Sequence, residues 1–238
     1  MRPASARSLV RLLYGHAMEA RATARFRRTL RMLRNAFEFV SLQDAVALLR
    51  DPNRPAGRYL SFSFDDGYRD NYELIAPLLQ EFGATACFFV STGFVDCDES
   101  YRVRFLRDVV LQPETRYPMT WPMVRELAER GFEFGAHTVD HVNLAAVTPT
   151  EAERQVLKSR LDLEQAGVRC KWFAWPYGTE AHLPEALLPV LASHFDAVFS
   201  AIRSRRPWSY GGRVINRDHF EPGWPSLHVR FFAFRPTT

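Results

Sequence analysis

The chain has 238 residues, of which 47% are hydrophobic and 24% are charged, and its formal net charge is +4 at pH 7. This composition is typical of a globular protein and excludes a chain that is disordered throughout. The three cysteines form no C-x-x-C pair, so neither a disulfide framework nor a cysteine zinc site is predicted. The length allows one large domain or two small ones.

The N-terminal part of the chain is rich in arginine. Residues 1–25 are interpreted as a basic N-terminal segment and residues 26–238 as a single domain. The surplus of arginine favours an anionic substrate, nucleic acid or a lipid surface, but a solvated helix face explains it equally well. Because no apolar stretch is long enough for a signal peptide or a membrane span, we expect a cytoplasmic location.

Predicted strands and helices alternate along the chain, which favours a parallel α/β fold because the connections are too long for hairpins. Residues 91–118 are predicted to form a long loop with a helical piece over 101–111. The region after residue 200 gives no clear pattern. The predicted strands are 37–40, 59–66, 84–90, 132–136, 172–175 and 196–200, and the predicted helices are 26–33, 42–49, 72–82, 121–130, 149–166 and 184–194.

Three of these helices begin with a residue suited to capping. Ser41 and Thr120 are predicted N-caps, and Pro122 fits the first turn that follows Thr120. Thr148 is predicted to cap the helix that starts at Pro149, with Glu151 completing a capping box.

The most informative stretch is YLSFSFDDGY, residues 59–68. Its alternation of apolar residues and serines predicts a strand, which ends in Asp65, Asp66 and Gly67. Two adjacent carboxylates repel each other, so they are poor structural partners but suit a site where a cation or a proton transfer gives them different roles. A simple turn that closes the strand is the alternative interpretation.

Polar clusters follow three of the predicted strands. They are Asp65-Asp66-Gly67, residues 137–141 with the sequence HTVDH, and Pro176-Tyr177-Gly178. In a parallel barrel the loops after the strands share one face, and active sites lie there. We therefore expect the three clusters to meet.

The HTVDH cluster has the spacing of a pair of metal ligands. If this segment is helical, His137 and His141 present their imidazoles on one side, which suits a divalent metal. One exposed histidine and one hydrogen-bonded histidine would explain the pattern without a metal. An added aspartate would give three ligands with open positions, which is the arrangement of a catalytic metal.

The order FSFDDG, HTVDH and FAWPYG, each after a predicted strand, resembles the polysaccharide deacetylase family, whose domain is shared with the chitooligosaccharide deacetylases of nodulation-factor synthesis. The similarity spans residues 26–216 and includes the spacers LIAPLLQEFGATACFFVSTGF and KSRLDLEQAGVRCKWFAWPYG. The resemblance implies a distorted (β/α) barrel of about seven parallel strands.

The resemblance also implies roles for individual residues. Asp65 would be the general base, and Asp66, His137 and His141 would hold the metal. The backbone N–H of Tyr177 would stabilise the oxyanion, with Pro176 and Tyr177 contacting the substrate. Zinc is the expected metal, with cobalt, nickel and manganese as alternatives.

The chain departs from the family pattern at two points. Ala174 occupies the position where many members have an arginine that orients the base, so Asp65 needs another partner, for which Arg213 and Arg217 are candidates. No clean motif for the general acid follows, and His219 is preferred to His228 only because it comes soon after the last strand. His16, His182 and His194 belong to no recognisable constellation.

The sequence therefore predicts a metal-dependent hydrolase that removes an acetyl group from an N-acetylated amino sugar on a polysaccharide, oligosaccharide, glycolipid or sugar-bearing intermediate. Two alternatives stay open: hydrolysis of another amide or cyclic imide at the same site, and a non-catalytic carbohydrate-binding member. No nucleic-acid partner and no membrane span are expected, and the oligomeric state is open.

Overall fold

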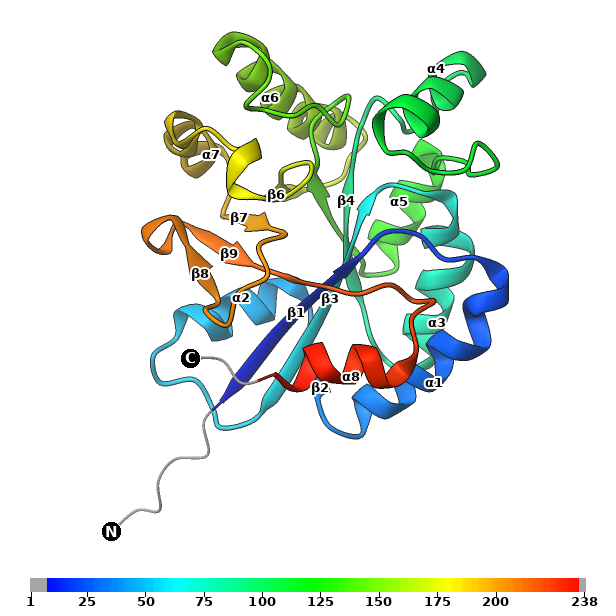
Figure 1. Ribbon diagram of the computed structural model, residues 1–238, viewed down its shortest axis with the longest axis vertical. Helices are drawn as coiled ribbons and strands as arrows, with labels where there is room; N and C mark the ends of the chain where they lie inside the picture. Colours follow the sequence, from blue (N-terminus) through cyan, green and yellow to red (C-terminus); the bar gives the residue numbers. More distant parts are fainter. Residues whose placement is uncertain (1–7, 236–238) are drawn as a thin grey trace.

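The computed structural model describes residues 8–235, and it shows a curled, mainly parallel sheet covered by helices on its outside (Figure 1). Within these residues seven strand positions follow one another round a distorted barrel, which confirms the predicted fold class. The strands at these positions are β1 (Leu9–Gly15), β3 (Arg58–Asp66), β4 (Ala86–Val90), β5 (Glu133–Ala136), β6 (Cys170–Ala174), β7 (Ala197–Ser200) and the pair β9 (Val214–Asn216) and β10 (Asp218–His219).

The segment 214–219 links the two edges of this sheet. Its first half, β9, pairs in parallel with β7, and its second half, β10, pairs in parallel with β1. Arg217 lies between the two halves. One short stretch of chain therefore brings β7 and β1 together, and the sheet curls round on itself.

Helices connect successive strands and pack against the outer face of the sheet (Figure 1). Among residues 8–235, none of the helices combines the length and the apolar character needed to cross a membrane. The helices are α1 (Thr23–Arg34), α2 (Leu42–Arg50), α3 (Ala76–Glu81), α4 (Glu99–Arg104), α5 (Trp121–Glu129), α6 (Pro149–Gln165), α7 (Leu188–His194) and α8 (Ser226–Phe234), and the two short strands off the barrel are β2 (Glu38–Phe39) and β8 (Trp208–Ser209).

Strand β1 was not predicted. Sequence analysis places residues 1–25 in a basic N-terminal segment, whereas Leu9–Gly15 form a buried strand that pairs with β3 along its whole length. The charge of Arg11 hides the strand pattern. In the fold the guanidinium of Arg11 is buried. It forms an ion pair with Asp218 of β10 at 2.8 Å, so its charge is compensated inside the sheet. Residues 1–7 lie outside the described part of the chain.

The predicted caps are mostly confirmed. The side chains of Ser41, Thr120 and Thr148 accept hydrogen bonds from backbone N–H groups in the first turns of α2, α5 and α6. The reciprocal half of the capping box is wrong, because the carboxylate of Glu151 accepts hydrogen bonds from the side chains of Arg154 and Gln155 instead.

Two predicted helices are broken into shorter pieces. The helix predicted over 72–82 begins with a π-helical turn, η2 (Asn71–Ile75), and continues as α3. The piece predicted over 101–111 starts earlier, as α4, and ends in a second π-helical turn, η3 (Phe105–Val109). Asp98 begins α4, because its carboxylate accepts a hydrogen bond from the backbone N–H of Tyr101.

Alternation along the strands divides the core into an outer and an inner part. Phe62 and Phe64 of β3 point outward into the large cluster between sheet and helices, where Phe64 contacts Phe26 of α1. Ser63 and Asp65 take the opposite direction, into the barrel. Strand β3 therefore carries a row of polar side chains on its inner side, and Asp65, the predicted general base, belongs to that row.

The inner row is held by one buried ion pair. Both guanidinium NH₂ groups of Arg217 bind the carboxylate of Asp65, at 2.8 Å each, and Arg217 also donates to the hydroxyl of Ser63 and the carbonyl of Ser200. The guanidinium lies over the rings of Tyr14 and Phe89. Because Arg217 comes from the segment that closes the barrel, this pair connects strand β3 to the closure.

We expect Arg217→Gln to destabilise the fold by about 3–5 kcal/mol, because it leaves the carboxylate of Asp65 buried without its partner. The measurement is the free energy of unfolding in urea. Arg213→Gln is the control, since Arg213 is exposed and its guanidinium makes only a surface hydrogen bond to the carbonyl of Tyr210 and a 3.9 Å approach to Glu185, so its loss should cost less than about 0.5 kcal/mol. Equal effects of the two substitutions would contradict the assignment.

Candidate metal centre and active site

The three polar clusters meet at the carboxyl ends of β3, β5 and β6. Asp66 ends β3, and His137 and His141 lie in the loop that follows β5. The three side chains are buried, and each offers a ligand atom within 4.8 Å of the other two. The fold therefore brings together the three residues predicted as metal ligands.

The spacing of these atoms fits a shared ion better than hydrogen bonds. Oδ1 of Asp66 lies 3.5 Å from Nε2 of His137 and 3.3 Å from Nε2 of His141. Hydrogen bonds between such groups are shorter, whereas two ligands about 2.0–2.1 Å from a tetrahedral ion are about 3.3 Å apart. Among the described residues, Oδ1 of Asp66 is buried and has no hydrogen-bond partner. The residues present thus fit a divalent metal.

The protonation states also suit a metal. Nδ1 of His137 donates a hydrogen bond to the carbonyl of Ala174 at 2.7 Å, which leaves the lone pair on Nε2 facing Asp66. Burial lowers the pKa of His141, so this imidazole is neutral. Burial opposes ionisation of Asp66, but the two facing imidazoles outweigh it and hold the pKa of Asp66 well below its usual range.

The histidine loop is not helical. Val139 and Asp140 form bends, and Thr138 and His141 have left-handed backbone angles, with φ values of 65° and 54°. Asp66 and Tyr177 share this conformation, with φ values of 77° and 63°. Non-glycine residues adopt it at a cost, and such strain is concentrated at functional sites. The histidines therefore converge through the turns of a loop and not through a helix period.

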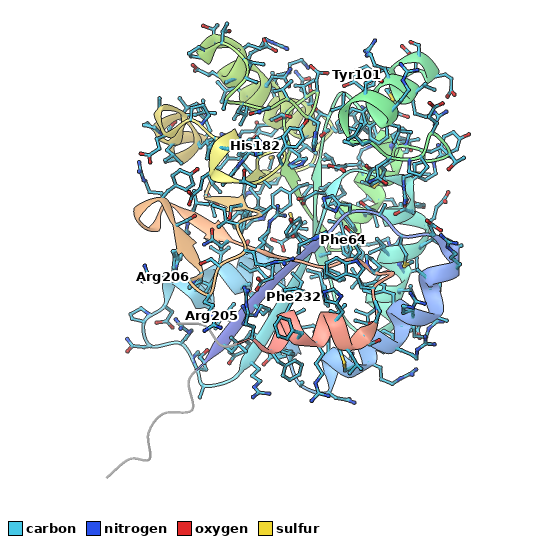
Figure 2. All side chains as sticks on the ribbon, in the orientation of Figure 1. Phe64, Tyr101, His182, Arg205, Arg206 and Phe232 are labelled. Carbon is cyan, nitrogen blue, oxygen red and sulfur yellow. The ribbon has the colours of Figure 1, made fainter. Side chains whose placement is uncertain are left out.

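Two side chains that the sequence analysis did not select hold this loop. The amide oxygen of Gln155 accepts hydrogen bonds from the backbone N–H groups of Val139 and Asp140. The carboxylate of Asp140 accepts hydrogen bonds from the amide of Gln155, at 2.7 Å, and from the hydroxyl of Tyr101, at 2.8 Å. Tyr101 reaches the loop from α4, on the upper side of the barrel (Figure 2).

Asp65 lies beside the metal candidates but has a separate partner. Its carboxylate forms the two-point ion pair with Arg217. Of the two arginines considered from the sequence, Arg217 thus contacts Asp65, and Arg213 does not, since it bonds Tyr210 and faces Glu185. Position 174 holds an alanine, so the guanidinium that contacts Asp65 comes instead from Arg217, in the segment that closes the barrel.

The third cluster contributes Pro176 and Tyr177. Pro176 is buried, whereas the side chain of Tyr177 is 46% exposed and its ring packs edge-on against the ring of His141, 5.0 Å between centroids. In the described part of the chain no hydrogen bond uses the backbone N–H of Tyr177. The tight turn that follows requires Gly178, because a Cβ there would lie 2.2 Å from Ala201. This loop therefore lies next to the metal candidates with a free donor.

The general-acid candidate His219 belongs to a second cluster. Its Nε2 lies 2.8 Å from Oε1 of Glu221, and Nδ1 of His16 lies 2.7 Å from the same oxygen. These separations are those of hydrogen bonds, so Glu221 accepts a proton-bearing nitrogen from each histidine. The ring of Tyr14 packs between His219 and the guanidinium of Arg217, which connects this cluster to Asp65.

His16 was missed by the sequence analysis. Its position at the end of β1 was hidden because β1 itself was not predicted. Burial lowers the pKa of His16, but its hydrogen bond to Glu221 and the charge of Asp66 outweigh burial and raise the pKa to about 9. His16 is therefore protonated at neutral pH.

The other histidines belong to neither the metal set nor the Glu221 cluster. His228 is exposed on α8, and the ring of Trp224 stacks on it at 4.6 Å and separates it from His219. His182 lies in the loop after β6 (Figure 2), where it bonds Thr179 and packs its ring against the ring of Tyr177, 5.0 Å between centroids. His194 ends α7, where its carbonyl and ring accept from Arg160. The geometry favours His219 over His228.

Comparison with known proteins gives the family and the fold. The family model of polysaccharide deacetylases matches residues 53–192. The chain is 23% identical over 126 residues to YxkH of Bacillus subtilis (strain 168), a protein named for the same family; the match covers 53% of this chain and 39% of that protein's length.

Solved deacetylase structures share the fold over most of the chain. IcaB from Ammonifex degensii superposes with a TM-score of 0.73 at 21% identity, over 97% of this chain and 99% of that chain. The Streptococcus pyogenes deacetylase PplD, solved in complex with acetate, superposes with a TM-score of 0.70 at 19% identity, over 98% and 100% of the two chains. The family model covers more than half of this chain, and the protein belongs to the polysaccharide deacetylase family.

Proposed function

We propose that the protein is a metal-dependent N-deacetylase that hydrolyses the acetamide of an N-acetylated amino sugar. The observation that carries this proposal is the pairing of two different carboxylates. Asp66 faces His137 and His141 at metal-ligand spacing, whereas its neighbour Asp65 is held by Arg217 and stays free of the metal set. A base and a metal site side by side are what amide hydrolysis by water requires.

Each residue of the site has a distinct task in this proposal. Asp66, His137 and His141 would hold a divalent ion, with zinc as the expected metal, which supplies Lewis-acid chemistry and acidifies water when bound. Asp65 takes a proton from the attacking water, and Arg217 fixes the direction of its carboxylate. The backbone N–H of Tyr177 donates to the oxygen of the acetamide as negative charge develops there. Pro176 and the ring of Tyr177 border the substrate.

The leaving amine must receive a proton, and the pair His16 and His219 supports this step. Both rings donate to the single oxygen Oε1 of Glu221, so the carboxylate favours the protonated form of the pair. His219 was the candidate from sequence, and His16 joins it because its raised pKa keeps a proton available at neutral pH. We infer that the pair acts as the general acid.

The substrate class rests on the family. An acetylated sugar is the substrate that the family implies. The cytoplasmic location stays a prediction from the sequence. Hydrolysis of another amide or cyclic imide would use the same residues in the same roles. The non-catalytic alternative rests on Ala174 and on the missing motif for the general acid, and it loses force because Arg217 supplies the base with a cationic partner.

Removal of one ligand should abolish metal binding. We expect His137→Gln to weaken zinc affinity by more than about 100-fold, because loss of a direct ligand costs more than loss of an outer partner. Metal content after dialysis is the measurement, and His194→Gln, which alters an exposed histidine at the end of α7 and outside the metal set, is the control. Unchanged zinc content in the His137 variant would remove this residue from the site.

Asp65→Asn separates the base from the metal ligands. The amide keeps the shape of the side chain but cannot accept the proton, so we expect acetate release to fall by at least about 100-fold while zinc content stays at one ion per chain. Acetate release and metal content are measured on the same sample. If this variant turns over at the wild-type rate, the base lies elsewhere.

The pH profile tests the general acid. Despite burial, the hydrogen bond to Glu221 raises the pKa of His16 and favours its acid form, so the rate of the metal-loaded enzyme should fall at alkaline pH as that form is lost. Glu221→Gln removes the hydrogen-bonding carboxylate, which lowers the pKa of His16 and should move the alkaline limb to lower pH. His194→Gln serves again as the control. An alkaline limb that stays in place in the Glu221 variant would exclude this cluster as the proton donor.

A further inference from the structure

Helix α8 presents large apolar side chains to solvent. Leu227 is 76% exposed and Phe231 is 65% exposed. Together with Arg230 and Phe234 they occupy about 100° of the helix circumference. The opposite side of α8 is already buried through Val229, Phe232 and Ala233. The exposed apolar side chains therefore do not contribute to the core, and large apolar side chains exposed together mark an interaction surface.

The surroundings of these residues are strongly basic. Helix α8 packs on α1, and neither helix contains an acidic residue. Arg28 and Arg31 of α1 and Arg230 of α8 line a shallow hollow of about 520 Å³ between the two helices. In the described chain none of these three guanidinium groups has a carboxylate within 4.0 Å. Within residues 8–235 none of the three is therefore held in an ion pair, and the nearby acid Glu81 of α3 is paired with Arg27.

We propose that this surface, formed by Leu227, Arg230 and Phe231 of α8 with Arg28 and Arg31 of α1, docks on an anionic lipid bilayer. The arginines match the headgroup phosphates, and the two apolar side chains enter the interfacial layer. A symmetric contact between two copies would set arginines against arginines, with no acid in either helix to relieve the repulsion. Lipid satisfies both the charge and the apolar groups.

The surface is connected to the active site through a few contacts. The ring of Trp224, which directly precedes α8, lies 4.9 Å from the ring of His219, and the hydroxyl of Ser226 at the start of α8 bonds Thr29 of α1 at 2.8 Å. Docking would therefore set the His16–Glu221–His219 cluster near the lipid. Figure 2 shows Phe232 on the same helix, below the barrel strands. The inference stands apart from the proposed reaction, since lipid binding needs no turnover.

The test is co-sedimentation of the full chain with lipid vesicles. Vesicles of phosphatidylcholine with about 30% phosphatidylglycerol should bind the protein, and pure phosphatidylcholine should not. Arg28→Gln/Arg31→Gln should weaken binding roughly 30-fold, because each arginine contributes about 1 kcal/mol near such a surface. Leu227→Ser/Phe231→Ser should weaken it about tenfold or more through lost apolar burial. Binding by the wild type should also fall at high salt.

Matched substitutions on other elements are the controls. Leu161→Ser replaces a leucine on α6 that is 47% exposed, and Arg125→Gln/Arg169→Gln removes the same charge from α5 and the loop after α6. All variants alter exposed groups and should keep the thermal midpoint of the wild type. The proposal is wrong if the wild type ignores anionic vesicles, if the controls weaken binding equally, or if the α8 substitutions only abolish a dimer seen by gel filtration.

Discussion

The buried ion pair between Asp65 and Arg217 is the interaction on which both the fold and the site depend. Arg217 stands between β9 and β10, at the point where one segment connects β7 to β1 and closes the sheet. Its guanidinium binds both oxygens of Asp65, so the carboxylate is fixed in direction. The closure of the barrel and the orientation of the proposed base therefore depend on the same ion pair, so a substitution that removes the pair affects both.

The neighbouring carboxylate has a different role because its surroundings differ. Asp66 has a left-handed backbone and turns its side chain toward two imidazoles, whereas Asp65 continues the inner row of β3. A buried oxygen without a hydrogen-bond partner is costly unless a cation satisfies it. The adjacent carboxylates thus face different partners, which are Arg217 for Asp65 and the two imidazoles for Asp66, and this is how a pair of like charges can coexist in a buried site.

Much of the fold could be predicted because its signals are local, whereas the set Asp66, His137 and His141 was expected from the resemblance carried by three short motifs. Strand β3 shows its alternation, and the capping residues Ser41 and Thr120 mark where helices begin. The misses have a common cause, which is long-range pairing. The charge of Arg11 argued against a buried strand at β1, because the sequence does not show that Asp218 compensates it. Without β1, the position of His16 at the end of that strand could not be predicted. Gln155 of α6 holds the loop of His137 and His141 through its side-chain amide, and no spacing in the sequence predicts this contact.

The central claim is that a metal held by Asp66, His137 and His141 supports removal of acetyl groups from amino sugars. The most direct measurement is acetate release from a panel of N-acetylhexosamine oligomers, nucleotide sugars and glycolipids, by the zinc-loaded wild type, the chelated protein and the chelated protein with zinc restored. Our account predicts release from at least one substrate that is lost on chelation and recovered with zinc. Release that persists unchanged after complete removal of metal would contradict it.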